Sequence, residues 1–360
     1  MKTPLAAIGL RGFPGVQGGV ERHCAEILPH LDIPCRVYRR KPFIKSKSPA
    51  PRNITFVDLP STRIKGFEAA WHTVLCVAHL LFHPVRIVNI HNIGPALLSP
   101  FLKLRGMRVV LTYHSTNYHH QKWGKFAKMI LKVGEKIGFR FSDRIIFVNE
   151  SMIGEIKNKE VLAKSVVIPN PISKNIPTVS TEFCDRIGVR QKKYILAVGR
   201  LTPEKGFETL IRAAASIPRE YKIVIAGGAD NDSSYFSYLK SLDKDNRVIF
   251  TGYADRITLT ELYSHARLFV LPSLFEGMSL ALLEAMSFNL PVCASDIVAN
   301  RLPELEKKAI FFKPNDEIDL QTAIHTALSS ERITDYNLSR YAPENVTHST
   351  SEIYRELLNN

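Results

Sequence analysis

One of the two most informative segments of the chain is Leu271-Pro-Ser-Leu-Phe-Glu-Gly-Met-Ser-Leu-Ala-Leu-Leu-Glu284, which is expected to lead from a buried strand through a short loop into a helix. The apolar run 268–271 predicts the strand, and Ser279 belongs to the residue types that cap helices. Glu276 then lies in the loop, and Glu284 lies about one and a half turns into the helix. A strand, a loop and a helix in this order form the repeating unit of parallel α/β sheets.

The same rhythm runs along the whole chain. Short apolar runs bounded by Gly, Pro, Asn or Asp predict buried parallel strands at 6–10, 54–57, 87–90, 109–113, 145–148 and 166–168, and again at 194–198, 222–226, 247–250, 268–271, 291–294 and 310–312. The Pro-rich stretch 169–177 interrupts the pattern and marks a linker. We therefore expect two Rossmann-like, doubly wound α/β domains facing one another across a cleft, with a boundary between 172 and 173.

Composition narrows the class of protein. A chain of 360 residues predicts about two domains. Its five cysteines are scattered and never spaced as C-x-x-C, which favours a reducing compartment and argues against a structural zinc site. The apolar runs are too short for a signal peptide or a membrane span, so we expect a soluble or peripheral protein.

The charge is uneven. Residues 1–180 carry 27 Lys and Arg against 10 Asp and Glu, and residues 181–360 carry 21 against 24. The first half therefore has a net charge of +17 and the second half −3, within a total of +14. Such an asymmetry points to an acidic partner for the N-terminal half.

Two fixed cations precede the carboxylates in Gly199-Arg-Leu-Thr-Pro-Glu-Lys205-Gly206, which follows the predicted strand 194–198. Arg200 and Lys205 suit a diphosphate, and the helix expected at 207–216 would add backbone amides. Alone, this segment would fit an ordinary surface turn. Paired with Glu284, which suits a ribose, and Glu276, which suits a second sugar, it indicates a nucleotide-sugar site.

Two features of the first half are candidates for the same chemistry. Gly18 and Gly19 form a Gly-rich turn that opens a helix and could cradle phosphates, although the spacing is not G-x-G-x-x-G and a plain tight turn is an equal alternative. His114 ends the strand 109–113, is followed by Ser115 and Thr116, and is expected to face the cleft. His91 ends the strand 87–90 and fits a structural hydrogen-bonding role.

Two basic segments predict a surface for an anionic membrane or a diphosphate-lipid acceptor rather than a solvated face. The helix expected at 122–140 gathers its cations on one side and places Phe126, Ile130, Val133 and Ile137 toward the core. The segment 36–52 adds seven cations and no acid. The residues expected at the surface are Arg39, Arg40, Lys41, Lys122, Lys125, Lys128 and Lys132. No nucleic-acid motif is visible, so nucleic acid is not an expected partner.

With these residues in place, the chain resembles the family 4 retaining glycosyltransferases of the GT-B fold. The resemblance covers nearly the whole length and rests on G-R-x-x-x-x-K-G at 199–206, on the two glutamates of 276–284, on Gly18-Gly19-Val-Glu and on His114. The stretches 9–19 and 118–124 are similar to bacterial members that build surface polysaccharides such as lipopolysaccharide or capsule.

The resemblance implies a division of labour between the domains. Residues 1–172 would take the acceptor, residues 173–344 would bind the donor, and a helix at about 345–360 would pack back on the first domain. Arg200 and Lys205 would hold the diphosphate, Glu284 the ribose and Tyr253 the base. The group around the donor sugar would be Glu276, Gly277, Met278 and Ser279.

The expected activity is metal-independent, cofactor-free transfer of a hexosyl or deoxyhexosyl group with retention, and the catalytic residues would be His114, Glu276, Arg200 and Lys205. The donor would be a UDP-sugar in the first place, with GDP- and dTDP-sugars open, and the acceptor a lipid-linked or oligosaccharide molecule. The expected location is cytoplasmic, on the inner face of the cell membrane. A nucleotide-sugar epimerase of the same fold and a non-catalytic membrane-bound scaffold stay open as alternatives.

Overall fold

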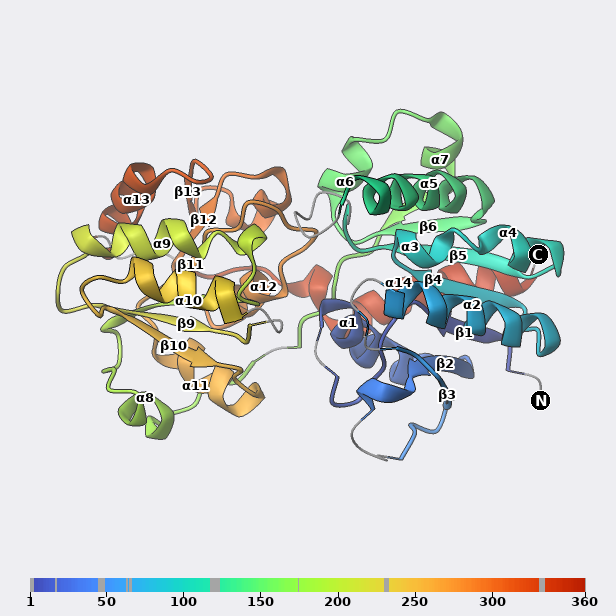
Figure 1. Ribbon diagram of the computed structural model, residues 1–360, viewed down its shortest axis with the longest axis horizontal. Coiled ribbons are helices and arrows are strands. Elements are labelled where there is room, and N and C mark those ends of the chain that lie inside the picture. The colour runs from blue at the N-terminus through green and yellow to red at the C-terminus, as the bar shows by residue number, and fades with distance from the viewer. Residues whose placement is uncertain are drawn as a thin grey trace. The chain divides into compact units, whose positions relative to one another are not determined.

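The computed structural model describes residues 3–16, 18–44, 49–62, 64, 67–116, 124–173, 175–229, 233–329 and 334–359. The chain divides into two compact units, which are drawn with their elements labelled in Figure 1. Unit 1 comprises 1–171 and 339–360, and unit 2 comprises 172–338. The boundary predicted from the sequence, after residue 172, lies one residue later than the observed one. The chain returns to unit 1 at residue 339, whereas the sequence predicted this return at about 345.

Unit 1 is built on a seven-stranded sheet of order β3-β2-β1-β4-β5-β6-β7. All its strand pairs are parallel, which confirms the expected sheet type. Its strands are β1 (Leu5–Ile8), β2 (Cys35–Arg40), β3 (Ile54–Leu59), β4 (Ile87–His91), β5 (Arg108–Tyr113), β6 (Arg144–Phe147) and β7 (Ser165–Val167). Because a parallel sheet is covered on both faces, β1, β4 and β5 are almost wholly buried.

The helices of unit 1 form two groups. The C-terminal helix α14 packs against α1 and β4, and both helices contribute to one core, where Cys24 and Ile27 meet Tyr354 and Leu357. Helices α2, α3, α4 and α5 contact one another in a second group. The helices of the unit are α1 (Gly19–Ile27), α2 (Phe67–Phe82), α3 (Ile93–Ala96), α4 (Ser99–Leu104), α5 (Lys125–Phe141), α6 (Glu150–Gly154), α7 (Lys159–Ala163) and α14 (Pro343–Asn359).

The prediction that Arg39 and Arg40 lie on a membrane surface is wrong, because both belong to strand β2 and are 5% exposed. Arg39 donates to both carboxylate oxygens of Asp58, at 2.6 and 2.8 Å, and Arg40 forms an ion pair with Glu68 at 3.1 Å. Buried guanidinium groups need such partners, since an unpaired charge is costly away from water. Lys41, directly after the strand, is exposed as expected.

Helix α5 also differs from its expected orientation. Lys122 lies outside the described residues, Lys125 and Lys132 are exposed, and Lys128 is half-buried. Three of the side chains expected in the core are exposed instead, since Phe126 is 71%, Val133 is 42% and Ile130 is 37% exposed, whereas Ile137 is half-buried. The buried residues of the helix are Gly134 and Gly138.

Unit 2 is built on a six-stranded parallel sheet of order β10-β9-β8-β11-β12-β13. Its strands are β8 (Tyr194–Val198), β9 (Lys222–Ala226), β10 (Val248–Gly252), β11 (Leu268–Leu271), β12 (Val292–Ser295) and β13 (Ile310–Phe312). Its helices are α8 (Glu182–Arg186), α9 (Phe207–Ala213), α10 (Ser233–Leu242), α11 (Arg256–His265), α12 (Leu280–Ser287) and α13 (Glu317–Ser329). Strands β8 and β11 are neighbours, so the loops that carry the candidate residues leave from adjacent strands.

Among the described residues, no helix has both the length and the apolar character needed to cross a membrane. The five cysteines are all buried and none forms a disulfide.

Candidate functional site

The loops after β8 and β11 touch through a glycine. Gly206 has a left-handed backbone (φ +64°), and a Cβ built on it would lie 2.2 Å from the Pro272 carbonyl oxygen. Only glycine accepts both the backbone conformation and this approach. The Leu274 amide donates to the Glu204 carbonyl at 2.9 Å and ties the same two loops together. This contact places the 3-10 turn η4 (Pro203–Lys205) against the segment that carries Glu276.

Lys205 and Glu276 meet as a result. The Lys205 Nζ lies 2.6 Å from Glu276 Oε1, and their side chains are 18% and 8% exposed. The Ser273 hydroxyl donates to the same carboxylate oxygen at 2.7 Å. Two donors therefore fix the Glu276 carboxylate, while the ammonium group of Lys205 keeps further N–H donors for an anion.

Arg200 lies nearby but is held more loosely. It follows β8, its side chain is 45% exposed, and its NH2 lies 3.9 Å from Glu204 Oε1. A half-exposed pair at this distance contributes little to stability. The structure thus gathers Arg200, Lys205 and Glu276 around the ends of β8 and β11.

Glu284 is buried in helix α12, with 7% of the residue exposed. The Tyr263 hydroxyl donates to Glu284 Oε2 at 3.0 Å. Ser279 caps the helix by accepting from the Leu282 amide at 3.3 Å, as the sequence predicts. Gly277, Met278 and Ser279 are buried and join Glu276 to the start of this helix.

Tyr253 follows strand β10. In the strand order β10-β9-β8-β11, two strands separate β10 from β11, the strand that precedes Glu276. Its side chain is 61% exposed. A Cβ on Gly228, after β9, would lie 3.9 Å from the Tyr253 Cβ, so the two loops run together. An exposed ring at this place offers a flat surface for a base.

The carboxylate of Glu21 lies against the glycine loop of unit 1. Gly18 precedes helix α1, which starts at Gly19, and has a backbone φ of 148°. A Cβ on Gly18 would lie 1.9 Å from Glu21 Oε2, and the other oxygen of that carboxylate accepts from the Arg11 amide at 2.8 Å. Both glycines are exposed.

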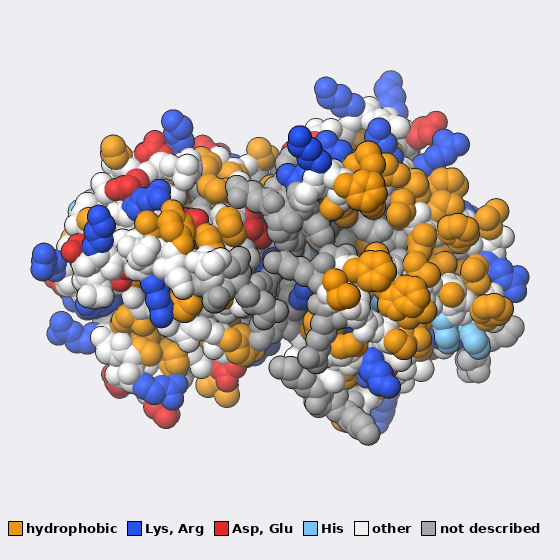
Figure 2. Space-filling view, viewed as in Figure 1, with side chains coloured by type: hydrophobic (Ala, Val, Ile, Leu, Met, Phe, Trp, Pro, Cys, Tyr) orange, Lys and Arg blue, Asp and Glu red, His pale blue; other side chains and the backbone are white. Residues whose placement is uncertain are grey.

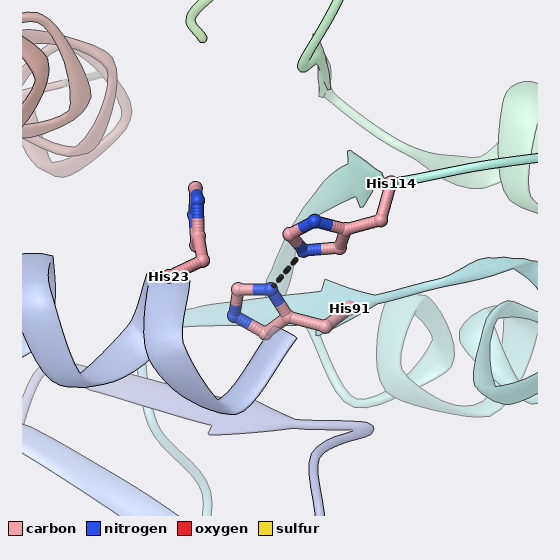
Figure 3. Close-up of side chains that lie close together, drawn as sticks. All are labelled: His23, His91 and His114. Atoms are coloured by element: carbon pink, nitrogen blue, oxygen red, sulfur yellow. Dashed lines mark hydrogen bonds between the residues drawn. The ribbon is translucent and has the colours of Figure 1, made fainter. Parts of the chain in front are cut away.

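Unit 1 brings three histidines together at the ends of β4 and β5 and on α1, as Figure 3 shows. The ligand atoms of His23, His91 and His114 all lie within 4.8 Å of one another, and the three residues are buried. His91 Nδ1 lies 3.0 Å from His114 Nε2, and His23 Nδ1 lies 3.0 Å from Asn170 Oδ1. The sequence analysis identified His91 and His114 but missed His23. The available signal was the position of His23 in the helix that begins at the Gly18-Gly19 turn.

Burial keeps these imidazoles neutral. It lowers the pKa of His23 to about 4, and it lowers the pKa of His91 and His114 well below the ordinary value, with the neighbouring imidazoles adding to the effect. Burial also raises the pKa of the Cys24 thiol, whose Sγ lies 3.4 Å from His91 Nε2. The cluster is therefore uncharged at neutral pH.

Hydrogen bonding couples the tautomers of two of the rings. If the Cys24 thiol donates to His91 Nε2, then His91 Nδ1–H donates to His114 Nε2, and His114 carries its own proton on Nδ1. In the opposite arrangement His91 Nε2–H points to the sulfur, and His114 Nε2–H donates to His91 Nδ1. In the first arrangement His114 Nδ1 is a donor suited to a hydroxyl group. Three neutral imidazoles are also a donor set that could hold a transition-metal ion.

Both halves of the chain match known protein families. Residues 17–175 match the family model Glycosyltransferase Family 4, and residues 183–345 match the model Glycosyl transferases group 1. An uncharacterized glycosyltransferase of Methanocaldococcus jannaschii is 31% identical over 48% of this chain and 47% of its own length. O-antigen chain mannosyltransferase B of Escherichia coli is 26% identical over 64% of this chain and 61% of its own.

Solved structures share the fold over the whole chain. Sucrose-phosphate synthase from Thermosynechococcus elongatus has a TM-score of 0.81 at 20% identity and covers 99% of both chains. The Anabaena protein HepE, solved in complex with UDP-glucose, has a TM-score of 0.77 at 16% identity and covers 98% of this chain and 99% of its own. The two units thus have the GT-B fold of glycosyltransferases, as expected. The aligned part of the two curated relatives is only about half to three fifths of their length.

The neutral histidines make the stability of unit 1 depend on pH. Because the pKa of His23 is about 4 in the folded chain against 6.5 when unfolded, the unfolded chain binds more protons below pH 6.5, and the free energy of unfolding should fall from there toward pH 4. His23→Gln should flatten this slope by on the order of 1 kcal/mol per pH unit. Both tryptophans, Trp71 and Trp123, belong to unit 1, so urea unfolding followed by their fluorescence at pH 7, 6 and 5 measures it.

The matched control is His348→Gln, whose side chain is 67% exposed on α14. A slope that stays the same in His23→Gln as in the unchanged protein would contradict the assignment.

Proposed function

We propose that this chain, whose two halves both match glycosyltransferase families, transfers a sugar from a nucleotide-sugar to an acceptor hydroxyl with retention of anomeric configuration. The observation that carries the proposal is the arrangement of Arg200, Lys205 and Glu276 at the ends of β8 and β11, with Glu284 in the helix that follows. Cations for a diphosphate and carboxylates for sugar hydroxyls come from loops held together by Gly206.

The donor would be held group by group. Arg200 and Lys205 would bind the diphosphate, and Glu284, oriented by Tyr263, would accept from the ribose hydroxyls. Glu276 with the backbone of Gly277–Ser279 would bind the transferred sugar, and Tyr253 would contact the base. UDP is favoured as the nucleotide because structures of HepE, a protein of the same fold, contain UDP and UDP-glucose.

Transfer would proceed on one face of the sugar. As the bond from the anomeric carbon to the phosphate oxygen breaks, the acceptor oxygen forms its bond on the same face, and its proton passes to the leaving phosphate. Arg200 and Lys205 would stabilise the negative charge that develops on the nucleoside diphosphate. We assign to neutral His114 a hydrogen bond to a donor-sugar hydroxyl, and to Gly18 and Gly19 backbone amides near the phosphates.

The acceptor is proposed to be lipid-linked or an oligosaccharide of a bacterial surface polysaccharide, and the protein to lie on the cytoplasmic face of the membrane. The resemblance to an O-antigen mannosyltransferase supports a polysaccharide acceptor. The net charge of +17 on residues 1–180 supports an anionic surface as partner.

Arg200→Ala should lower the rate of transfer about a hundredfold, because it removes one cation from the developing charge. The Arg200 side chain is 45% exposed, so the variant should remain folded, and urea unfolding checks this. Release of nucleoside diphosphate from a panel of UDP-, GDP- and dTDP-sugars with a lipid-linked acceptor measures the rate, and Lys313→Ala, with its side chain 77% exposed, is the matched control.

Lys205→Ala needs a partner variant, since it leaves the buried Glu276 carboxylate without its cation. The double variant Lys205→Met with Glu276→Gln removes both charges and should also be slow while remaining folded. Turnover within threefold of the unchanged protein in Arg200→Ala would rule out the diphosphate assignment. Turnover of the donor without any acceptor would instead favour an epimerase.

We further propose that transfer needs no metal ion or cofactor, because Arg200 and Lys205 supply the positive charge at the diphosphate. Dialysis against EDTA should leave the rate unchanged within error, and added Mg²⁺ or Zn²⁺ should not raise it. The idea fails if the chelator abolishes transfer and a divalent ion restores it. In that case, loss of the Zn²⁺ response in His23→Gln would locate the ion at the three histidines.

A further inference from the structure

Unit 1 exposes a concentration of large apolar side chains on three helices that lie side by side, since α4 contacts both α2 and α5. Figure 2 shows hydrophobic side chains gathered over these helices. We call this surface the apolar face, and each of its members is at least 37% exposed. It comprises Phe67, Trp71, Val74 and Phe82 of α2, Phe101 and Leu104 of α4, and Phe126, Met129, Ile130 and Val133 of α5.

The exposure follows from how α5 packs. A Cβ on Gly134 would lie 2.5 Å from the Ile93 carbonyl oxygen, and a Cβ on Gly138 would lie 2.8 Å from the Ala96 Cβ. The helix therefore approaches α3 through its glycines, and Phe126, Met129, Ile130 and Val133 are left on the outside. Soluble proteins rarely leave so many large apolar side chains together in water, so the apolar face points to a partner.

The charges around the apolar face have one sign. Exposed cations are Arg105, directly after α4, and Lys125, Lys132, Lys136 and Arg140 on α5. The described residues of α2, α4 and α5 include two acids, and neither is exposed. Glu68 is paired with Arg11 and Arg40, and Glu135 accepts from the Tyr113 hydroxyl. The surface therefore combines apolar side chains with positive charge.

We propose that the apolar face inserts into the interface of an anionic lipid bilayer, with the cations of α5 on the lipid headgroups. This deepens the proposed function, which places the acceptor at a membrane, by naming the docking surface and its mode of binding. Apolar insertion combined with anionic-lipid attraction is the pattern of amphipathic helices that lie in a bilayer interface. A second copy fits less well, because a two-fold contact through α5 would bring its like charges together.

The proposal is tested by sedimentation of the full chain with vesicles of phosphatidylglycerol and phosphatidylcholine. Leu104→Ser with Phe126→Ser should weaken binding at least tenfold at low and high salt, since it removes two side chains meant to be buried in lipid. These side chains are 85% and 71% exposed, so the core is untouched. The matched control is Ile257→Ser with Ile318→Ser, two residues of unit 2 that are 80% and 74% exposed.

The cations are tested separately. Lys125→Gln with Lys132→Gln should weaken binding at low salt by roughly fivefold for each lysine, and the difference should shrink as salt rises. Trp71 reports insertion in the variant Trp123→Phe, where it is the one remaining tryptophan. Its emission should shift to the blue on vesicle binding and be quenched by brominated acyl chains.

Three results would overturn the proposal. The first is no binding to anionic vesicles, and the second is equal binding by the Leu104→Ser and Phe126→Ser variant. The third is a lipid-free dimer, seen by analytical ultracentrifugation, that this variant abolishes, which would make a second copy the occupant. Nucleotide binding by unit 2 is measured on the same protein preparations in the absence of vesicles. A failure of the proposed donor site is therefore recognised independently of vesicle binding.

Discussion

The candidate donor site depends on one close approach, that of the Gly206 α-carbon to the Pro272 carbonyl oxygen, where a Cβ would lie at 2.2 Å. It presses the turn after β8 against the loop after β11 and so brings Lys205 within 2.6 Å of Glu276. A second close approach, of Gly227 to the Gly199 carbonyl, joins the ends of β8 and β9. The charges of the site are thus positioned by backbone packing at the carboxyl ends of parallel strands, the edge where open α/β sheets bind ligands.

The groups at the carboxyl edge of the sheet are charged in unit 2 and neutral in unit 1. Unit 2 holds charged groups there, with Lys205 paired to Glu276, whereas unit 1 holds three imidazoles that burial keeps neutral. A similar glycine contact operates in unit 1, because a Cβ on Gly9 would lie 2.3 Å from the His91 carbonyl oxygen. Charged groups suit a diphosphate, and neutral donors and acceptors suit hydroxyl groups, so the proposed reaction uses each kind of group for the ligand it fits.

The sequence predicted those elements whose signal is local. Strands β8, β9, β11 and β13 have the predicted bounds, because each is a short apolar run between breakers. Strand β2 was missed because Arg39 and Arg40 look like surface cations, and their partners Asp58 and Glu68 lie far along the chain. The apolar residues of α5 were assigned to the core because periodicity gives no sign that Gly134 and Gly138 make the contact. The ion pair between Lys205 and Glu276 was likewise not predictable from the sequence pattern, because it depends on tertiary packing.

Binding of nucleotides to the unchanged protein and to Glu284→Ala tests the central claim most directly, that unit 2 holds a nucleotide-sugar. Thermal unfolding with UDP, GDP, ADP and dTDP at about 100 times Kd should show one nucleotide adding about 2.7 kcal/mol to the free energy of unfolding, and this gain should be lost in Glu284→Ala. No gain with any of these nucleotides, or a gain that Glu284→Ala leaves unchanged, would contradict the account.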